Sequence, residues 1–381
     1  MQGVIHTRKV VSSVFFVAIA IGGFLVPASS GAQELLPEVE HIWKAQAVSV
    51  SSATTTFEAF GVESQSQILE ARILEGERSG EVVQFRNDYI LLKSGDRFYL
   101  RHSVQPGGED SFAVFDRDRH LVLGVLALLF VAAVIFLGGI QGVRALLSLI
   151  ASFLLIMYVL VPSLLAAYPP VLVSVVIAAG ILALAIFLTH GINRGSVVAF
   201  VGTVTAVLCT GALATLVSYF AGFTGLGPDE ATYLNLATGG TLDLAGLLLA
   251  GIIIGMLGVL DDIAITQVAV VRELYHATPD MSRHEVYTRA MRVGKEHAGA
   301  LVNTLVLAYS GAALPLIMLF ALSEESMLFF INREIFAVEI VRALVGSIGL
   351  MVAVPVTTAL AAWFLRGHAH GVGPVHGHHH G

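Results

Sequence analysis

Long apolar runs dominate this chain and leave it few ways to fold in water. A helix needs roughly 20 apolar residues to cross a bilayer. Eight runs approach or exceed that length, namely 10–26, 121–140, 145–166, 170–189, 196–220, 244–264, 298–321 and 339–364. Of the 381 residues, 56% are hydrophobic and 13% are charged, whereas soluble domains carry about 25% charged residues. The sequence therefore predicts an all-α polytopic membrane helix bundle with seven or eight crossings.

The first run fits two descriptions. Arg8 and Lys9 precede its apolar core and the small residues PASSGA follow it, a pattern typical of a secretory signal, yet the core is long enough to act as an anchor. We expect residues 1–32 to be a signal peptide cleaved after Ala32, with a signal anchor as the alternative. In both cases residues 33–119 are exported. The only cysteine, Cys209, lies in a predicted crossing, so the exported segment has no disulfide framework.

The distribution of basic residues predicts the orientation, because short loops rich in Lys and Arg stay in the cytoplasm. With the N-terminus inside, the inner side collects Arg8, Lys9, Arg144, Arg194, Arg272, Arg283, Arg289, Arg292, Lys295 and Arg366. The short outer loops hold only Arg333. We therefore expect a multipass protein of the cytoplasmic (inner) membrane with its C-terminus in the cytoplasm.

Residues 33–119 have the composition of a soluble domain. The runs 81–85, 89–93 and 97–102 are rich in β-branched and aromatic residues, and turn-forming residues separate them at 86–88 and 94–96. We expect a small extracytoplasmic β-barrel-like domain of five or six short strands. Residues 120–366 then form the transmembrane bundle.

Two acids, Asp261 and Asp262, lie inside an apolar run. A helix from Asp243 to Arg272 would be about 42 Å long, which places both acids in the inner third of the bilayer. Ionisable residues at such depth usually face the bundle interior or a wet cavity and mark a pathway or relay. Neighbouring helical residues point about 100° apart, so the two acids cannot face each other. We expect Asp262, which shares a face with Thr266, to line a proton or ion pathway, with Asp261 as the less certain member. The alternative is a structural pair solvated among the inner headgroups.

Other polar and small residues recur at helical spacing within the predicted crossings. Glu296, near the inner boundary, and Asn303 share one stripe of the next helix, and Thr304 lies on the adjoining stripe with His297; we assign Glu296, Asn303 and Thr304 to the same pathway. Packing roles are predicted for a hydroxyl seam and for a GxxxG pair that allows close helix approach, namely Ser196, Thr203, Thr210, Gly251 and Gly255. Pro315 and Pro355 remove backbone donors and are expected to kink their helices.

The inner loop 272–297 has an ordered pattern. Ser282 and Glu285 form a capping box ahead of an apolar face, which predicts a short amphipathic helix lying along the cytoplasmic surface. His284 and Glu285 begin like the zinc-protease HExxH motif, but Thr288 occupies the position of the second ligand. No GxxxxGK[ST] loop occurs either, so no cofactor and no built-in ATPase are expected.

The tail 367–381 is rich in glycine and histidine and is expected to be disordered. Its histidines form a weak candidate site for a loosely bound divalent metal, and they are His368, His370, His376, His378, His379 and His380. An inert tail or a purification remnant is the alternative.

The stretch from GMLGVLDDIAITQ to AGALVNTLVLAYSGAALP, with GGIQGVRALLSL at 138–149 and FAVFDRDRH before it, resembles the bacterial YibE/F family. The resemblance runs from about residue 40 to 365 and implies an integral inner-membrane protein. A fainter similarity, to the pore-side half of SecF and the proton-driven RND-type exporters, implies that Asp261 or Asp262 couples proton flow to work. The all-β exported domain and two additional crossings depart from that pattern.

These features favour a transporter or translocase component, not an enzyme, driven by protons passing through the intramembrane carboxylates. One alternative is a membrane scaffold or metal-homeostasis protein with a cation-binding tail. The other is an intramembrane hydrolase, which would need a second deep acid facing Asp262. The expected partners are the lipid bilayer and a second copy or a related membrane subunit, with no nucleic acid.

Overall fold

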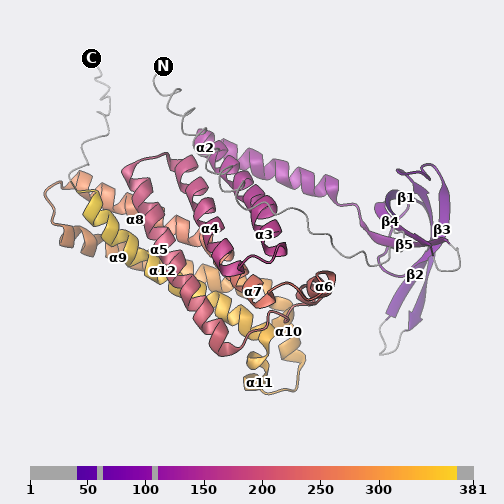
Figure 1. Ribbon diagram of the computed structural model, residues 1–381. Coiled ribbons are helices and arrows are strands. Elements are labelled where there is room, and N and C mark those ends of the chain that lie inside the picture. The colour runs from indigo at the N-terminus through magenta and orange to yellow at the C-terminus, as the bar shows by residue number, and fades with distance from the viewer. Residues whose placement is uncertain (1–40, 58–62, 105–109, 367–381) are drawn as a thin grey trace, which may run out of the picture. The chain divides into compact units, whose positions relative to one another are not determined.

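The computed structural model describes residues 41–57, 63–104 and 110–366 (Figure 1). The chain divides into two compact units, Gly31–Phe136 and Leu137–Gly381, the second of which also takes in Met1–Ser30. The expected signal segment 1–32 and the histidine-rich tail both lie outside the described residues.

The first unit is a curled antiparallel sheet of five strands. Its strands are β1 (His41–Phe57), β2 (Glu63–Ile73), β3 (Val82–Asn87), β4 (Arg97–Val104) and β5 (Asp110–Arg117). They pair in the order β3-β2-β1-β4-β5. Alternate residues of β1, Trp43, Ala45 and Ala47, point into a core that also holds Leu69 and Phe98, as the two-residue period of a strand requires. The predicted small β domain with about five strands is present.

The segment Tyr89–Lys93, predicted to be a strand, is not one. The side chain of Gln67 takes the place of a pairing strand there. Its Oε1 accepts from the backbone amide of Leu92 at 2.9 Å, and its Nε2 donates to the carbonyl of Leu92 at 3.1 Å. Asn87 Nδ2 holds the carbonyl of Ile90 at 2.6 Å. Side-chain amides therefore satisfy this buried backbone in an irregular conformation.

A charged cluster joins the hairpin of β4 and β5 to the turn before β3. His102 Nε2 lies 2.7 Å from Asp110 Oδ1, and Arg78 donates to the other oxygen of Asp110 at 2.8 Å and to Glu81 at 2.7 Å. The hydrogen bond from His102 and then that from Arg78 hold the pKa of Asp110 below its usual value. Ionised Asp110 therefore links three segments of the sheet.

The second unit is helical, and the helix that leads into it, α2 (His120–Leu155), begins within the first unit. This helix continues as η1 (Ile156–Leu160) and α3 (Val161–Leu165). The remaining helices are α4 (Pro170–Ala183), η2 (Leu184–Leu188), α5 (Arg194–Ala221), α6 (Asp229–Ala237), α7 (Leu244–Gly255), α8 (Leu257–Ala277), α9 (Arg283–Ala312), α10 (Leu314–Leu322), α11 (Met327–Asn332) and α12 (Glu334–Phe364). Five helical stretches in the described residues are long and apolar enough to cross a membrane. A sixth counts if the bent pair of α9 and α10 is one span. The expected seven or eight crossings are not confirmed.

The two crossings predicted at 121–140 and 145–166 fall in one helical stretch, His120–Leu165. Gly139 interrupts it with non-helical angles, φ 52° and ψ −134°. Glycine adopts positive φ without the steric cost that a β-carbon would bring. The break predicted between two runs is therefore a single residue, and no loop separates them.

Helices α7, α8 and α9 differ in their bounds from the expected helices. A break at Met256 splits the expected single helix after Asp243 into α7 and α8. The predicted amphipathic surface helix is the first half of α9, because its buried residues Val286 and Ala290 continue in phase with Gly294 and Ala298. Ser282 caps this helix as predicted, accepting from the amide of Glu285 at 3.2 Å.

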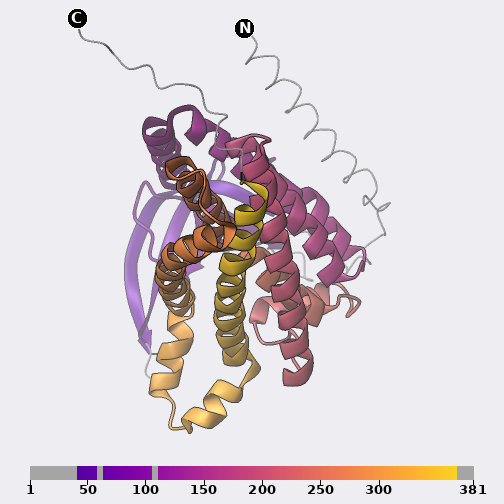
Figure 2. The same cartoon turned by 90° about the vertical axis from the view of Figure 1, so that its left-hand side faces the viewer.

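Of the two prolines, Pro315 marks a break and Pro355 does not. Pro315 lies in the first turn of α10, which bends 64° from α9. Figure 2 shows α9 continuing into α10 and α11 leading back into α12. Pro355 lies inside α12 without interrupting it.

Helices α5 and α12 approach closely through glycine and threonine. A β-carbon on Gly202 would lie 2.5 Å from Oγ1 of Thr357, and one on Gly349 would lie 2.8 Å from Cγ2 of Thr210. The hydroxyls of Thr203 and Thr210 donate to the carbonyls four residues earlier, so they need no partner on another helix. Ser196, Thr203 and Thr210, for which a packing role is predicted, are all buried.

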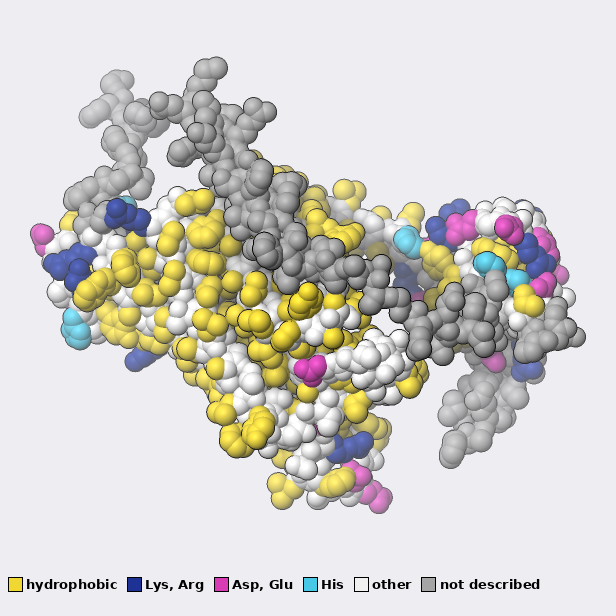
Figure 3. Space-filling model, in the orientation of Figure 1, with side chains coloured by type: hydrophobic (Ala, Val, Ile, Leu, Met, Phe, Trp, Pro, Cys, Tyr) yellow, Lys and Arg dark blue, Asp and Glu magenta, His cyan; other side chains and the backbone are white. Residues whose placement is uncertain are grey.

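Apolar side chains form a band between the ends of the helical unit. Figure 3 shows dark-blue basic side chains at the end where α8 meets α9, and both charge signs near α10 and α11. This arrangement of two charged ends separated by an apolar flank fits a membrane protein.

We expect Gly349→Val to destabilise the bundle by about 1–3 kcal/mol, because the added methyl groups would overpack the contact with Thr210. Gly251→Val is the matched control, since no heavy atom lies within 4 Å of a β-carbon built there. Unfolding of the detergent-solubilised chain by heat measures both. Equal midpoints for the two variants would contradict the close approach.

We expect Asp110→Asn to lower the unfolding midpoint of the sheet at neutral pH. Because the pKa of Asp110 is lowered in the folded state, its contribution is present above the unfolded-state pKa of about 4 and is lost as the pH falls through the folded-state value. The difference between wild type and variant should therefore shrink in acid. Trp43 fluorescence in a Trp363→Phe background reports on the sheet, and exposed Asp88→Asn is the control. A pH-independent difference would contradict this linkage.

Candidate functional site

The acidic pair lies on α8, one turn after the break at Met256. Asp262 Oδ2 is 3.8 Å from Nε2 of His297 on α9, so the two helices bring together a carboxylate inside a predicted crossing and an imidazole at the boundary of the next one. The side chain of Asp262 is 63% exposed and that of His297 is 34% exposed, although the Nε2 atom itself is buried without a hydrogen bond. The pair therefore lies at the surface of the isolated bundle, at the seam between α8 and α9.

Asp261 points in a different direction and is the more enclosed of the two acids. Its Oδ1 atom is buried and has no hydrogen-bond partner among the described residues. The expectation had been the reverse, with Asp262 facing the interior. The phase of α8 explains the difference: Leu260, Ile263, Ala264, Gln267 and Val271 face the bundle, and Asp262 lies opposite to that face.

The other predicted pathway residues lie on α8 and α9 and differ in exposure. Thr266 is half-buried, whereas Glu296, Asn303 and Thr304 are exposed. The hydroxyl of Thr304 donates to the carbonyl of Ala300 at 3.1 Å. In the described part of the chain no hydrogen bond joins Asn303 to Asp262, so the expected partnership of these two residues is not formed. His297, which shares the stripe of Thr304, is the side chain that reaches Asp262.

The GxxxG pair does not mediate the helix contact expected of it within one chain. Gly251 has open space where a β-carbon would be, and Gly255 faces only the hydroxyl of Tyr309, 3.3 Å from such a carbon. Both glycines are exposed together with Gly258. The close approaches use Gly202 and Gly349 on other helices instead.

A buried polar cluster that the sequence did not reveal lies at the junction of α8 and α12. Gln267 and Thr358 are both fully buried. The hydroxyl of Thr358 lies 2.9 Å from Gln267 Oε1 and 2.6 Å from the carbonyl of Val354, while Gln267 Nε2 has no partner among the described residues. A single glutamine within an apolar helix was the available signal, because a buried amide needs partners. Gly294 of α9 gives it space, since a β-carbon there would lie 2.7 Å from Nε2.

No group of three or more His, Cys, Asp or Glu side chains that could hold a metal occurs in the part of the chain that the structure describes. The six histidines proposed as a weak metal site, His368 to His380, lie outside that part. Cys209 is a free, exposed cysteine.

We expect substitutions of similar shape at Gln267 and at Thr358 to change the free energy of unfolding by different amounts. Thr358→Val leaves both polar atoms of Gln267 unsatisfied, so we expect a loss of about 1–3 kcal/mol. Gln267→Met removes an unpaired Nε2, and Thr358 keeps the carbonyl of Val354, so stability should stay equal or rise. Thermal or denaturant unfolding of both variants in one detergent measures the difference. A larger loss in Gln267→Met than in Thr358→Val would contradict the geometry.

Comparison with known proteins supports the membrane interpretation. A family profile described as YibE/F-like protein matches residues 126–367, well over half of the chain. The match covers the helices from α2 to α12 and leaves the five strands outside it, so it is shorter than the resemblance expected from about residue 40. Neither curated proteins nor solved structures gave a match. The chain belongs to the YibE/F-like family.

Proposed function

We propose that this protein is a membrane transport component in which protons move through the carboxylate and imidazole of Asp262 and His297. The observation that carries the proposal is the 3.8 Å approach of these two groups between α8 and α9. Carboxylates inside crossings are costly and are typical of ion pathways and proton relays. Histidine is the side chain whose unperturbed charge changes near neutral pH. Together they form a pair that can pass a proton between two helices.

Neighbouring groups support a relay of more than two members. Asp261 precedes Asp262 on the same helix turn and has a buried oxygen without a hydrogen-bond partner among the described residues. Glu296 precedes His297, and Asn303 and Thr304 continue along α9 towards its far end. These groups supply acceptors and donors on both sides of the pair. We assign the proton-carrying role to Asp262 and His297 and a flanking role to Asp261 and Glu296.

The proposal includes no hydrolytic role and no cofactor. A hydrolase with paired acids needs a second carboxylate opposite the first, and the side chain opposite Asp262 is His297. The inner membrane and the inward orientation expected from the basic residues are part of the proposal.

The test uses the full chain reconstituted into vesicles that contain a pH-sensitive dye. After an acid pulse, wild-type protein should dissipate the imposed pH gradient faster than protein-free vesicles do. Asp262→Asn should fall to the protein-free rate, because the amide cannot release a proton. Asp280→Asn, a matched change in the exposed turn between α8 and α9, should behave like wild type. Equal rates for wild type and Asp262→Asn would contradict the proposal.

A further inference from the structure

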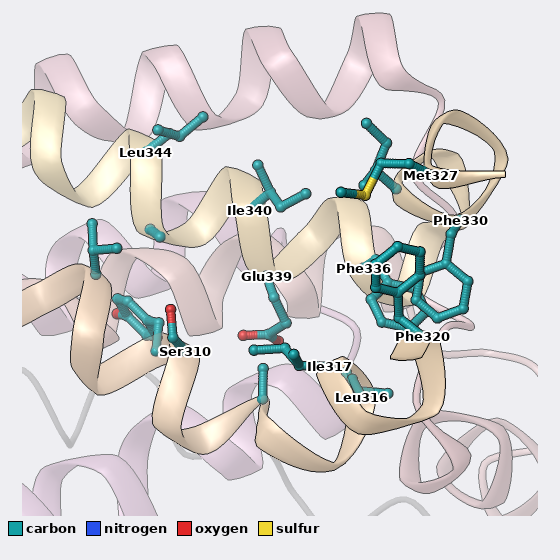
Figure 4. A pocket seen from close by; sticks show the side chains of 15 residues that line it. Ser310, Leu316, Ile317, Phe320, Met327, Phe330, Phe336, Glu339, Ile340 and Leu344 are labelled. Carbon is teal, nitrogen blue, oxygen red and sulfur yellow. The ribbon is translucent and has the colours of Figure 1, made fainter. Parts of the chain in front are cut away.

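A cavity of about 380 Å³ lies between α9, α10, α11 and α12, at the bend near Pro315. We call it the α10 cavity. Its walls are apolar apart from a few polar groups, and an aromatic cluster of Phe320, Phe330 and Phe336 closes one end (Figure 4). The rings of Phe330 and Phe336 are 3.8 Å apart between centroids, and those of Phe320 and Phe330 are 4.6 Å apart. Its volume falls within the range of small-molecule sites.

Glu339 is the only charged residue among the described residues that line this cavity. Figure 4 shows its carboxylate directed into the space near Ile317, with Ser310 on the neighbouring helix. The side chain is 25% exposed. A carboxylate among apolar and aromatic walls favours a cationic ligand over an anionic one, because it attracts the first and repels the second.

The carboxylate already has a charged partner on its own helix. Arg342, one turn further along α12, donates from Nη1 to Glu339 Oε1 at 2.8 Å. Arg342 does not line the α10 cavity. It lines an adjoining cavity of about 510 Å³ together with Glu230 and Pro228, and Glu339 lines both. Glu339, with Ala313 and Leu316, therefore lies between the two cavities, with the counter-charge Arg342 on one side and apolar space on the other.

We propose that the α10 cavity is a binding site for a hydrophobic amine, whose ammonium group pairs with Glu339 and whose apolar body lies against Phe320, Phe330 and Phe336. Two features of the lining fit this class of ligand. The ammonium would make a charge-assisted hydrogen bond to the carboxylate, and the aromatic rings offer faces to both the apolar body and the cation. The site shares no residue with the pair of Asp262 and His297, and its test does not depend on proton movement.

The experiment compares three probes that share one apolar body, 4-phenylbutylamine, 4-phenylbutanol and 4-phenylbutanoate. Their binding to the full chain in nanodiscs is measured by equilibrium dialysis, with empty nanodiscs subtracted. The amine should bind about tenfold more tightly than the alcohol, as the difference between charged and neutral hydrogen bonds implies. The carboxylate probe should bind most weakly. Equal binding of amine and alcohol, or preference for the carboxylate probe, would overturn the proposal.

Variants locate the site. Glu339→Gln should lose the preference for the amine while keeping the binding of the alcohol, and the matched change Glu325→Gln, in the exposed loop before α11, should keep the preference. Ala343→Phe, which fills the cavity, should abolish both. Because Glu339→Gln leaves Arg342 unpaired, the double variant Glu339→Gln/Arg342→Met removes both charges and should show the same loss of preference. An amine preference that survives in either Glu339 variant, or amine binding that survives in folded Ala343→Phe, would refute the assignment.

Discussion

The contact between α5 and α12 is the constraint on which the helical unit depends. Two glycines, Gly202 and Gly349, each receive a threonine from the other helix, so the backbones lie closer than larger side chains would allow. In a membrane, where lipid tails are as apolar as leucine, such close packing supplies much of the attraction between helices. From this pair α12 also reaches α8 through the hydroxyl of Tyr275, which donates to the carbonyl of Ala362 at 2.7 Å. The packing of α12 therefore helps to fix the position of α8, and with it the position of Asp261 and Asp262, although α12 does not itself carry these two acids.

Much of the architecture followed from local sequence signals. Apolar runs long enough to cross a membrane, the capping serine of α9 and the turn that contains Gly95 are encoded over a few residues each, and each appears in the structure. What the sequence did not reveal depends on contacts between distant segments. Residues 89–93 have strand composition, yet Gln67, more than 20 residues earlier, captures their backbone. The buried residues of α9 between Val286 and Ala298 likewise form one continuous face, and that face becomes apparent only when α9 packs against its neighbours.

The site shows the same division more sharply. Hydrophobic surroundings alone picked out Asp261 and Asp262, since an acid in an apolar run is costly wherever it points. Which acid faces inward depends on the rotation of α8, and that rotation is set by Leu260, Ile263 and Val271 packing on α5 and α12. Helical periodicity placed His297 beside Thr304 but gave no reason to prefer it over Asn303 as the partner of Asp262. In the structure Asp262 lies 3.8 Å from His297, and no hydrogen bond joins it to Asn303 in the described part of the chain.

The alternation of glycine and threonine between α5 and α12 also limits how this bundle can move. The helices run antiparallel there, and the two contacts are eight residues apart on each helix. A piston-like shift of α12 by one turn, about 5.4 Å, would put Val345 or Ala353 opposite Thr210 in place of Gly349. Both residues are larger than glycine, so neither would leave space for the side chain of Thr210. Rearrangements within this unit are therefore expected to carry α5 and α12 as one rigid body and to occur instead where α9 bends into α10.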